Sequence, residues 1–415
     1  MKFLLFPNFR HTFEFRILDA LRYALEKYGH QVHVSWRPTY PHVVSRMAKE
    51  LSADVVFQVN RPRPVDEPLP KGVRHITWIQ DARDDTMKTI SESSLDGDIA
   101  YEMHPLEGLL GYRPSLPILH ELLPPGVDRR IVDKLEPRPP AEEQFDFTMI
   151  GAMMQPMYAD EREDMLAYEA LNKTDYVNRK LARETTKRFS PKWILQRNEE
   201  QKEFDRRYSA TIAKTAMELA LTPFKGEGDY QKLEGIVAAA LEGVEPLDRN
   251  SVHYRLTYSR LINRTTIARY ILDLTDNVRF FGTDWKDHPE FQEYYGGYVH
   301  HQGQIVRINR STKIVVHENP NGCNFHDRVL YAMGGAAFIM LPSSHWDNVA
   351  GGFGSFFLPD EHFGDFDHST FHENARRWLS DEKARLQVAE VSRNEVLARH
   401  TYESRAERIL ADLER

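Results

Sequence analysis

The sequence has little of three things: it holds a single cysteine, no apolar run long enough to cross a bilayer, and no excess of basic residues. One cysteine, Cys323, excludes an intrachain disulfide and fits a reducing compartment. A net charge of −8 argues against a chain that wraps nucleic acid. Pro7, Arg10 and Glu14 interrupt the apolar start of the chain too early for a signal peptide. We therefore expect a cytoplasmic protein with no transmembrane segment and no nucleic-acid partner.

The composition that remains is that of a globular protein. Hydrophobic residues make up 41% and charged residues 28% of the 415 positions, a balance that separates the chain from disordered proteins. One hydrophobic core rarely grows to this length, so two domains of ordinary size are expected.

The first hundred residues alternate between apolar segments of strand length and segments of helical period. Between the first two strands, Ile17, Leu18, Leu21 and Leu25 follow helical spacing, and Gly29 stands where a helix would end. Such alternation predicts a parallel sheet with helices on both faces. The predicted strands are 2–8, 31–36, 53–60, 74–81 and 98–103.

A second alternating pattern follows a proline-rich stretch at 135–144, which reads as an interdomain linker. Residues 158–274 show helical periods and no clear strand, so most of this segment is expected to be an insertion. The predicted strands of the second half are 145–152, 277–282, 312–318, 336–341 and 355–359.

These patterns predict an α/β protein with two Rossmann-like parallel-sheet domains that face each other across a cleft. The first domain should comprise residues 1–140 and the second residues 145–395. A helical insertion at 158–270 should cover one side of the cleft or mediate homo-oligomer contacts. The last helix, 396–415, should pack back on the first domain. Ligands of such sheets bind outside the carboxyl ends of the strands, so the cleft is the expected site.

The stretch "GCNFHDRVLYAMGGAAFIM" at 322–340 combines a loop, a short helix, two glycines and a buried strand. The first amides of such a helix and its dipole favour a bound diphosphate. Arg328 lies in the first turn, where a cation is unfavourable unless an anion binds nearby, and arginine suits bidentate phosphate contacts. Gly334 and Gly335 let the helix end and the chain turn into the strand. An ordinary helix–strand junction with an exposed arginine would show the same spacing.

A series of motifs between residues 277 and 341 resembles the donor-binding half of GT-B glycosyltransferases. It is nearest to the CgeB-like, spore-maturation-type group among the group 1 glycosyltransferases. The last helical segment, "HTYESRAERIL", and the segment "ITWIQDARDD" in the first half resemble the same group. The motifs are Phe281-Gly282 with Trp285, Gly296-Gly297, Asn309 with Ser311, Lys313 and Ile314, then Arg328-Val329, Ala332-Met333 and Gly335.

The resemblance implies that a nucleotide-sugar binds to the second half as a co-substrate, with no cofactor. Arg328 is the first choice for the diphosphate, with Lys313 and His326 behind it. The family often carries a glutamate for the ribose hydroxyls where this chain has Tyr331, whose phenol can form one such hydrogen bond but brings no charge. The residues expected around the donor are Gly282, Lys313, Asn324, His326, Arg328, Tyr331 and Gly335.

A base that removes the proton of the acceptor hydroxyl should come from the first half. His11 and Asp81 follow strands of that half most closely, so we expect them to be catalytic. Glu14, Asp84 and Asp85 lie on the same two loops and are weaker candidates.

Zinc is a less favoured interpretation of the same region. Cys323 and His326 have Cys-x-x-His spacing, with His300, His301 and His317 nearby, but no paired ligand motif is present. No metal site is therefore expected. A nucleophilic Cys323 is less favoured still, because only His326 could activate it.

The sequence thus predicts a glycosyltransferase that moves a sugar from a nucleotide-sugar to a hydroxyl by a metal-independent mechanism. The acceptor would be a glycan, a protein or a small molecule. Two alternatives stay open: a binding or assembly protein that keeps the fold without turnover, and a sugar-nucleotide epimerase.

Overall fold

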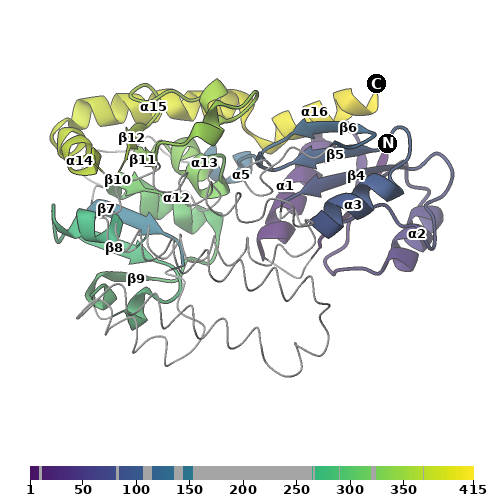
Figure 1. Cartoon of the computed structure of the whole chain (residues 1–415), viewed down its shortest axis with the longest axis horizontal. Helices are drawn as coiled ribbons and strands as arrows, with labels where there is room; N and C mark the ends of the chain where they lie inside the picture. The colour runs from purple at the N-terminus through teal and green to yellow at the C-terminus, as the bar shows by residue number, and fades with distance from the viewer. Residues whose placement is uncertain are drawn as a thin grey trace, which may run out of the picture.

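The computed structural model describes residues 1–8, 12–80, 84–105, 115–134, 144–152, 264, 267–288, 290–318, 324–367 and 369–415. These residues form two parallel sheets of six strands each, with helices packed against them (Figure 1). The predicted α/β architecture of two parallel-sheet halves is confirmed. Almost all of the predicted insertion, 158–270, lies outside the described residues, as does the predicted linker apart from its last residue.

The first sheet has the strand order β2-β1-β3-β4-β5-β6, and every neighbouring pair is parallel. All five strands that the sequence predicts here are present. The sequence does not predict β6, because two of its four residues are polar and all four are only partly buried. The elements are β1 (Lys2–Phe6), α1 (Thr12–Lys27), β2 (Gln31–Val34), α2 (Pro41–Glu50), β3 (Val55–Val59), β4 (Arg74–Ile79), α3 (Asp84–Ser93), β5 (Ile99–Glu102) and β6 (Leu119–Leu122).

Alternate residues of these strands enter different cores, as the period of a strand requires. Phe3 and Leu5 of β1 pack with α1, while Leu4 and Phe6 pack with α2. The helix α16 (Tyr402–Leu413), at the end of the chain, joins α1 on the same face of this sheet (Figure 1). Its Asp412, which is fully buried, accepts a hydrogen bond of 2.9 Å from the hydroxyl of Tyr101 in β5.

The second sheet has the order β12-β11-β10-β7-β8-β9, again parallel throughout. One predicted strand, 355–359, is wrong. A short 3-10 helix, Phe353–Ser355, runs into this segment, and Phe353 and Phe357 stack in the core. The segment forms only an isolated bridge at Pro359, so its burial comes mainly from aromatic packing. The strands are β7 (Phe145–Ile150), β8 (Val278–Phe281), β9 (Tyr295–Gly297), β10 (Thr312–Val316), β11 (Ile339–Pro342) and β12 (Gly364–Phe366).

Helices cover both faces of this sheet. The core on one face contains residues of α12 and α13, together with Val127 and Val132 from the segment between the halves. The core on the other face contains α14, α15 and the helical residues 267–271. The helices are α5 (Arg129–Val132), α12 (Gln302–Arg310), α13 (Asp327–Gly334), α14 (Phe371–Ser380) and α15 (Glu382–Arg399).

Two chain segments, one around Val127 and one around Thr401, pass from one half to the other and pair with each other. We call them the two crossings. Val127 donates its amide hydrogen to the carbonyl of His400 at 2.8 Å, and Tyr402 donates to the carbonyl of Val127 at 3.1 Å. A Cβ on Gly126 would lie 2.7 Å from the backbone carbon of Thr401, so only glycine allows this approach. The two crossings therefore form one connection.

The guanidinium of buried Arg405 holds both crossings. Its Nε donates to the carbonyl of Pro124 at 2.6 Å, and its Nη1 donates to the carbonyl of Arg399 at 2.9 Å. Burial lowers the pKa of Arg405 to about 10.

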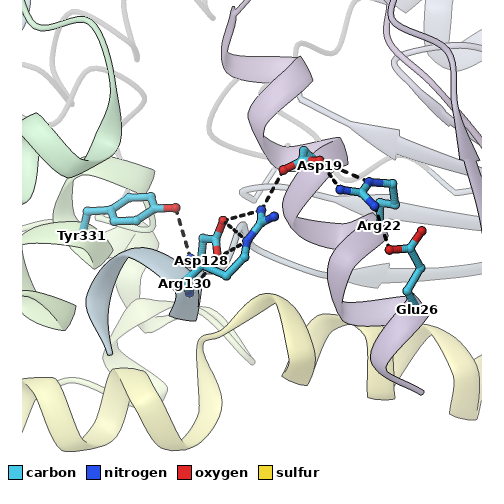
Figure 2. Close-up of polar contacts among 6 residues, drawn as sticks. All are labelled: Asp19, Arg22, Glu26, Asp128, Arg130 and Tyr331. Carbon is cyan, nitrogen blue, oxygen red and sulfur yellow. Dashed lines mark hydrogen bonds and ion pairs between the residues drawn. The ribbon is translucent and has the colours of Figure 1, made fainter. Parts of the chain in front are cut away.

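Ion pairs extend this connection to the first half. Figure 2 shows Arg130 between two carboxylates: Asp128, at 2.6 Å from Nη2, and Asp19 of α1, at 2.8 Å. The Asp128 amide donates to the hydroxyl of Tyr331 in α13 at 3.1 Å. One short segment thus contacts α1 on one side and α13 on the other.

Two histidines are buried in the fold without charge. The ring of His75 in β4 lies 3.1 Å from the amide oxygen of Gln58, and burial lowers its pKa to about 3. Burial likewise lowers the pKa of His400, at the crossing, to about 2. Both rings must stay neutral while the protein is folded.

The close approach at Gly126 predicts that Gly126→Ala destabilises the protein. The new methyl group would press on backbone atoms that hold the crossing, and such overpacking costs about 1–3 kcal/mol. Gly303→Ala in α12 is the matched control, because its Cβ would meet only a histidine side chain at 3.3 Å, and alanine favours the helix. Urea denaturation measures both variants. Equal stability of the two would contradict the tight pairing of the crossings.

The buried histidines predict a loss of stability in acid. Because the pKa of folded His75 lies below that of the unfolded chain, its contribution is present above pH 6.5 and is lost as the pH falls toward 3. Between pH 7 and 5, this one group should remove about 2 kcal/mol from the free energy of unfolding. Urea denaturation at both pH values should show that His75→Gln, which does not titrate, loses less stability than the parent. The same pH dependence of the free energy of unfolding in both proteins would contradict this explanation.

Candidate functional site

The carboxyl edge of the second sheet brings together the ends of three central strands and the start of α13. Gly151 follows β7, Gly282 follows β8, and His317 and Glu318 follow β10. Because parallel strands end at one edge, these residues are neighbours although the sequence separates them widely.

Gly282 and Gly151 make the close approach of β7 and β8 possible. Gly282 has a φ of 131°, and a Cβ there would lie 2.3 Å from the carbonyl oxygen of Gly151. The indole of Trp285 donates to that same oxygen at 2.6 Å. A Cβ on Gly151 would lie 2.8 Å from Nη1 of Arg328. The structure therefore places Gly282 beside the predicted site and gives it a role in shaping this edge.

Arg328 is held against the end of β7. Its Nη1 donates to the carbonyl of Ile150, and its Nη2 lies 3.3 Å from Nε2 of His326. These two contacts orient the guanidinium at the end of β7, and its charge also acts on the neighbouring Asp327 carboxylate. Arg328 and His326, both predicted from the sequence, are thus brought together at the start of α13.

His326 occupies the N-cap position of α13, where its Nδ1 has two neighbours. That nitrogen lies 3.2 Å from the amide of Arg328 and 2.7 Å from a carboxylate oxygen of Asp327. It accepts from the amide in one tautomer and donates to Asp327 in the other. The second tautomer also leaves Nε2 able to accept from Arg328. Although burial raises the pKa of Asp327, His326 and Arg328 hold it below its ordinary value.

His317 lies beneath this group. Its ring centroid is 4.9 Å from that of His326, and its side chain is 4% exposed. Burial lowers the pKa of His317 well below its ordinary value, and the charges of His326 and Arg328 add to the shift. Its Nε2 is buried with no hydrogen-bond partner among the described residues. A buried, neutral imidazole therefore lies at this edge.

A buried ion pair that the sequence analysis missed completes the site. Nε of Arg264 donates to Glu318 at 2.8 Å, and both side chains are less than a tenth exposed. The two residues are separated by 54 positions. Arg264 belongs to the segment predicted as an insertion, and no motif marks it as part of the site.

Asn324 stabilises the loop before α13. Its backbone amide donates to Asp347 at 2.7 Å, and its side-chain amide donates to Asp347 at 2.5 Å and to the carbonyl of Pro342 at 3.0 Å. Its role in the structure is to tie this loop to the end of β11, and its predicted contact with a donor stays a prediction.

Two predicted donor residues lie at the wrong end of their elements. Lys313 begins β10 and forms an ion pair of 2.7 Å with Asp146 near the start of β7, at the amino edge of the sheet. Gly335 caps the carboxyl end of α13, and a Cβ there would lie 2.9 Å from Val306. Both residues were predicted from sequence motifs. The direction of β10 places Lys313 at the amino edge, and the close packing of α13 against α12 explains the glycine at position 335.

Tyr331 faces the connection between the halves. It is 4% exposed, and its hydroxyl accepts the Asp128 amide (Figure 2). Burial raises the pKa of this phenol above its ordinary value. Its predicted contact with a ribose stays a prediction.

The predicted bases, His11 and Asp81, lie outside the described residues, as does Cys323. Glu14 is described: it is 3% exposed and accepts the amide of Asn8 at 2.5 Å, so it fixes the loop after β1. Across the described ranges, no trio of His, Cys, Asp or Glu is placed to hold a metal ion. In those ranges, no helix has the length and apolar character needed to span a membrane.

The carboxyl edges of the two sheets meet at Arg16. This residue of α1 donates to the carbonyl of His300, just before α12. Burial lowers the pKa of Arg16, and the nearby charge of Asp327 opposes that shift. The start of α1 therefore lies close to the start of α13.

The fold is similar to that of a solved protein structure. No curated protein matches the chain in sequence. A glycosyltransferase from Rickettsia africae ESF-5 is 9% identical, with 100% of this chain and 97% of that chain covered and a TM-score of 0.50. Sucrose-phosphate synthase from Thermosynechococcus elongatus is 10% identical, with 99% and 98% covered and a TM-score of 0.47. Anabaena Alr3699/HepE in complex with UDP is 10% identical, with 100% of each chain covered and a TM-score of 0.48.

At 9% identity, the similarity to the Rickettsia africae structure concerns the fold alone. Residues 260–411, which contain α13 and the whole carboxyl edge from β8 onward, match the model of a family described as glycosyl transferase-like. The chain therefore has a GT-B-type fold, and its residues 260–411 are similar to the glycosyl transferase-like family.

Proposed function

We propose that this protein transfers a sugar from a nucleotide-sugar donor to a hydroxyl group of an acceptor, without a metal ion. The observation that carries the proposal is the position of Arg328, whose guanidinium is fixed beside the first turn of α13 at the carboxyl edge of the second sheet. This is where a helix attracts an anion and where parallel sheets bind ligands.

The donor diphosphate would bind at the start of α13. The helix dipole and the charge of Arg328 both favour an anion there, and a guanidinium can contact two phosphate oxygens at once. The Arg264–Glu318 ion pair lies beside this position with its charges balanced, so it positions the end of β10 and adds little net field. Arg328 is thus the cation to which the diphosphate would respond.

Transfer breaks the bond between the anomeric carbon and the diphosphate oxygen, and negative charge grows on that oxygen as the bond breaks. Arg328 and the first amides of α13 would stabilise this charge, as fixed donors do at developing anions. The acceptor oxygen forms the new bond and loses its proton to a base. His11 and Asp81 remain our candidates for that base because both follow strands whose carboxyl ends face the second half.

The structure supports an acceptor site on the first half because the contact of Arg16 with His300 brings the two carboxyl edges together. A glycan, a protein or a small molecule could supply the hydroxyl. We also propose that the protein works in the cytoplasm, where nucleotide-sugars are available.

A second candidate function is a binding or assembly protein without turnover. The position of Tyr331 favours it, because this hydroxyl is engaged by the Asp128 amide and supplies no carboxylate for a ribose. Nucleoside diphosphate binding without sugar transfer would distinguish this candidate from the enzyme.

Replacing Arg328 should weaken diphosphate binding selectively. Loss of one charge-assisted contact costs about 1.5–3 kcal/mol, so Arg328→Met should lose about ten- to a hundredfold in affinity for nucleoside diphosphates. Binding of the corresponding nucleosides, which lack phosphates, should change little. Isothermal titration calorimetry with UDP, GDP, ADP and dTDP and their nucleosides measures both effects.

Arg307→Met is the matched control, since Arg307 is an exposed arginine on α12 in the same half. It should bind as the parent does. Equal weakening of nucleoside and diphosphate in Arg328→Met, or a parent that binds no nucleotide, would remove the donor site from this edge.

A further inference from the structure

A second group of polar residues lies at the carboxyl edge of the first sheet, outside the donor site. Asn8 follows β1, Asn60 and Arg61 follow β3, and Gln80 follows β4. Hydrogen bonds link them. The Arg61 guanidinium donates to the carbonyl of Asn8 at 3.0 Å, and the backbone amide of Gln80 donates to the side-chain oxygen of Asn60 at 2.6 Å. Glu14 of α1 accepts the Asn8 amide. We call these five residues the polar cluster.

Two side-chain atoms of the polar cluster are buried without a partner among the described residues. They are Nε of Arg61, a hydrogen-bond donor, and Oε1 of Gln80, an acceptor. A buried polar atom with no partner destabilises the fold, so such atoms are rare unless something else satisfies them. A donor and an acceptor together match a group that both accepts and donates, and a hydroxyl does this.

The charges of the polar cluster favour a neutral ligand over an anion. Burial lowers the pKa of Arg61, and the Glu14 carboxylate opposes that shift, so the two charges lie near each other. Glu14 already balances the guanidinium. An anion would add a second negative charge beside Glu14 and would also face the partial negative charge of the Gln80 oxygen, whereas a hydroxyl-bearing ligand avoids both penalties.

An aromatic surface lies on the same edge. Phe15 follows Glu14 on α1, and Trp36 follows β2, whose carboxyl end is next to that of β1. Their rings contact edge to face at 6.0 Å between centroids, and Trp36 is still 49% exposed. Hydrogen bonds from Ser35 and Thr39 to the carbonyl of Arg37 hold this loop. An exposed indole on the same edge of the sheet suits the apolar C–H face of a sugar ring.

We infer that the polar cluster, with Trp36, binds the acceptor as a neutral sugar, with one hydroxyl held between Arg61 and Gln80. The inference rests on the proposed function, since it names the substrate class for the acceptor side of the reaction. Arg61 and Gln80 would set specificity for an uncharged glycan acceptor.

The test uses the full-length protein and matched pairs of probes. Methyl glycosides of glucose, galactose and mannose are the neutral probes, and the corresponding methyl uronides are the anionic ones. Affinities are measured by saturation-transfer NMR titration with UDP present. UDP binding is measured separately by calorimetry, so that failure of the acceptor site and failure of the donor site can be distinguished.

The parent should bind at least one neutral glycoside more tightly than its uronide. Gln80→Met and Arg61→Met should weaken that binding tenfold or more, which corresponds to about 1.4 kcal/mol, while UDP binding stays unchanged. Arg46→Met, at an exposed arginine of α2, should bind as the parent does. Gln80→Met should melt no lower than the parent, because it removes a buried acceptor that lacks a partner among the described residues.

Four results would overturn the inference. One is a parent that binds UDP but no neutral glycoside, which would leave the donor site standing. The second is tighter binding of the uronides, and the third is glycoside binding that both variants retain. The fourth is a lower melting temperature for Gln80→Met together with its loss of glycoside binding, which would assign Gln80 to the fold.

Discussion

The backbone pairing of the two crossings is the constraint on which the rest of the structure depends. Val127 exchanges hydrogen bonds with His400 and Tyr402, and Gly126 allows the approach. Because the chain passes between the halves only here within the described residues, this pairing sets how the two carboxyl edges face each other. Arg405 holds the crossings from one side, while Arg130 and Tyr331 connect them to α1 and α13 (Figure 2). The Tyr331 hydroxyl thus ties α13 to the crossing at Asp128.

Burial and charge act together at both edges. In the second half, Glu318 pairs with Arg264, and the contacts with Ile150 and His326 hold the Arg328 guanidinium beside the start of α13. In the first half, Glu14 lies near Arg61, and the remaining groups are neutral amides. The edge with a directed cation suits a diphosphate, and the edge with balanced charge suits hydroxyl groups. This difference is the physical basis for assigning donor and acceptor to opposite halves.

Much of the fold could be predicted from the sequence because strands buried on both faces read as continuous apolar runs. This holds for β1, β3 and β4, whereas β6 and β9 are short and carry polar residues or glycine, so no run marks them. The segment 355–359 has the same apolar character as a strand but packs as aromatic side chains in the core. The position of Arg328 and His326 at the start of a helix could be predicted because a helix start is a local signal, while their contact with a donor stays a prediction. Arg264 could not be found, since its contact with Glu318 depends on tertiary structure, and Lys313 shows that a motif does not reveal which edge of the sheet a residue occupies.

A crystal structure of the protein with a bound nucleoside diphosphate would test the central claim most directly. The account predicts phosphate oxygens within about 3 Å of the Arg328 guanidinium and of the first amides of α13. It also predicts that the Arg264–Glu318 ion pair and the Arg328 contact with β7 persist in the complex. A diphosphate bound at the polar cluster, at the amino edge near Lys313, or anywhere away from the start of α13 would contradict the account.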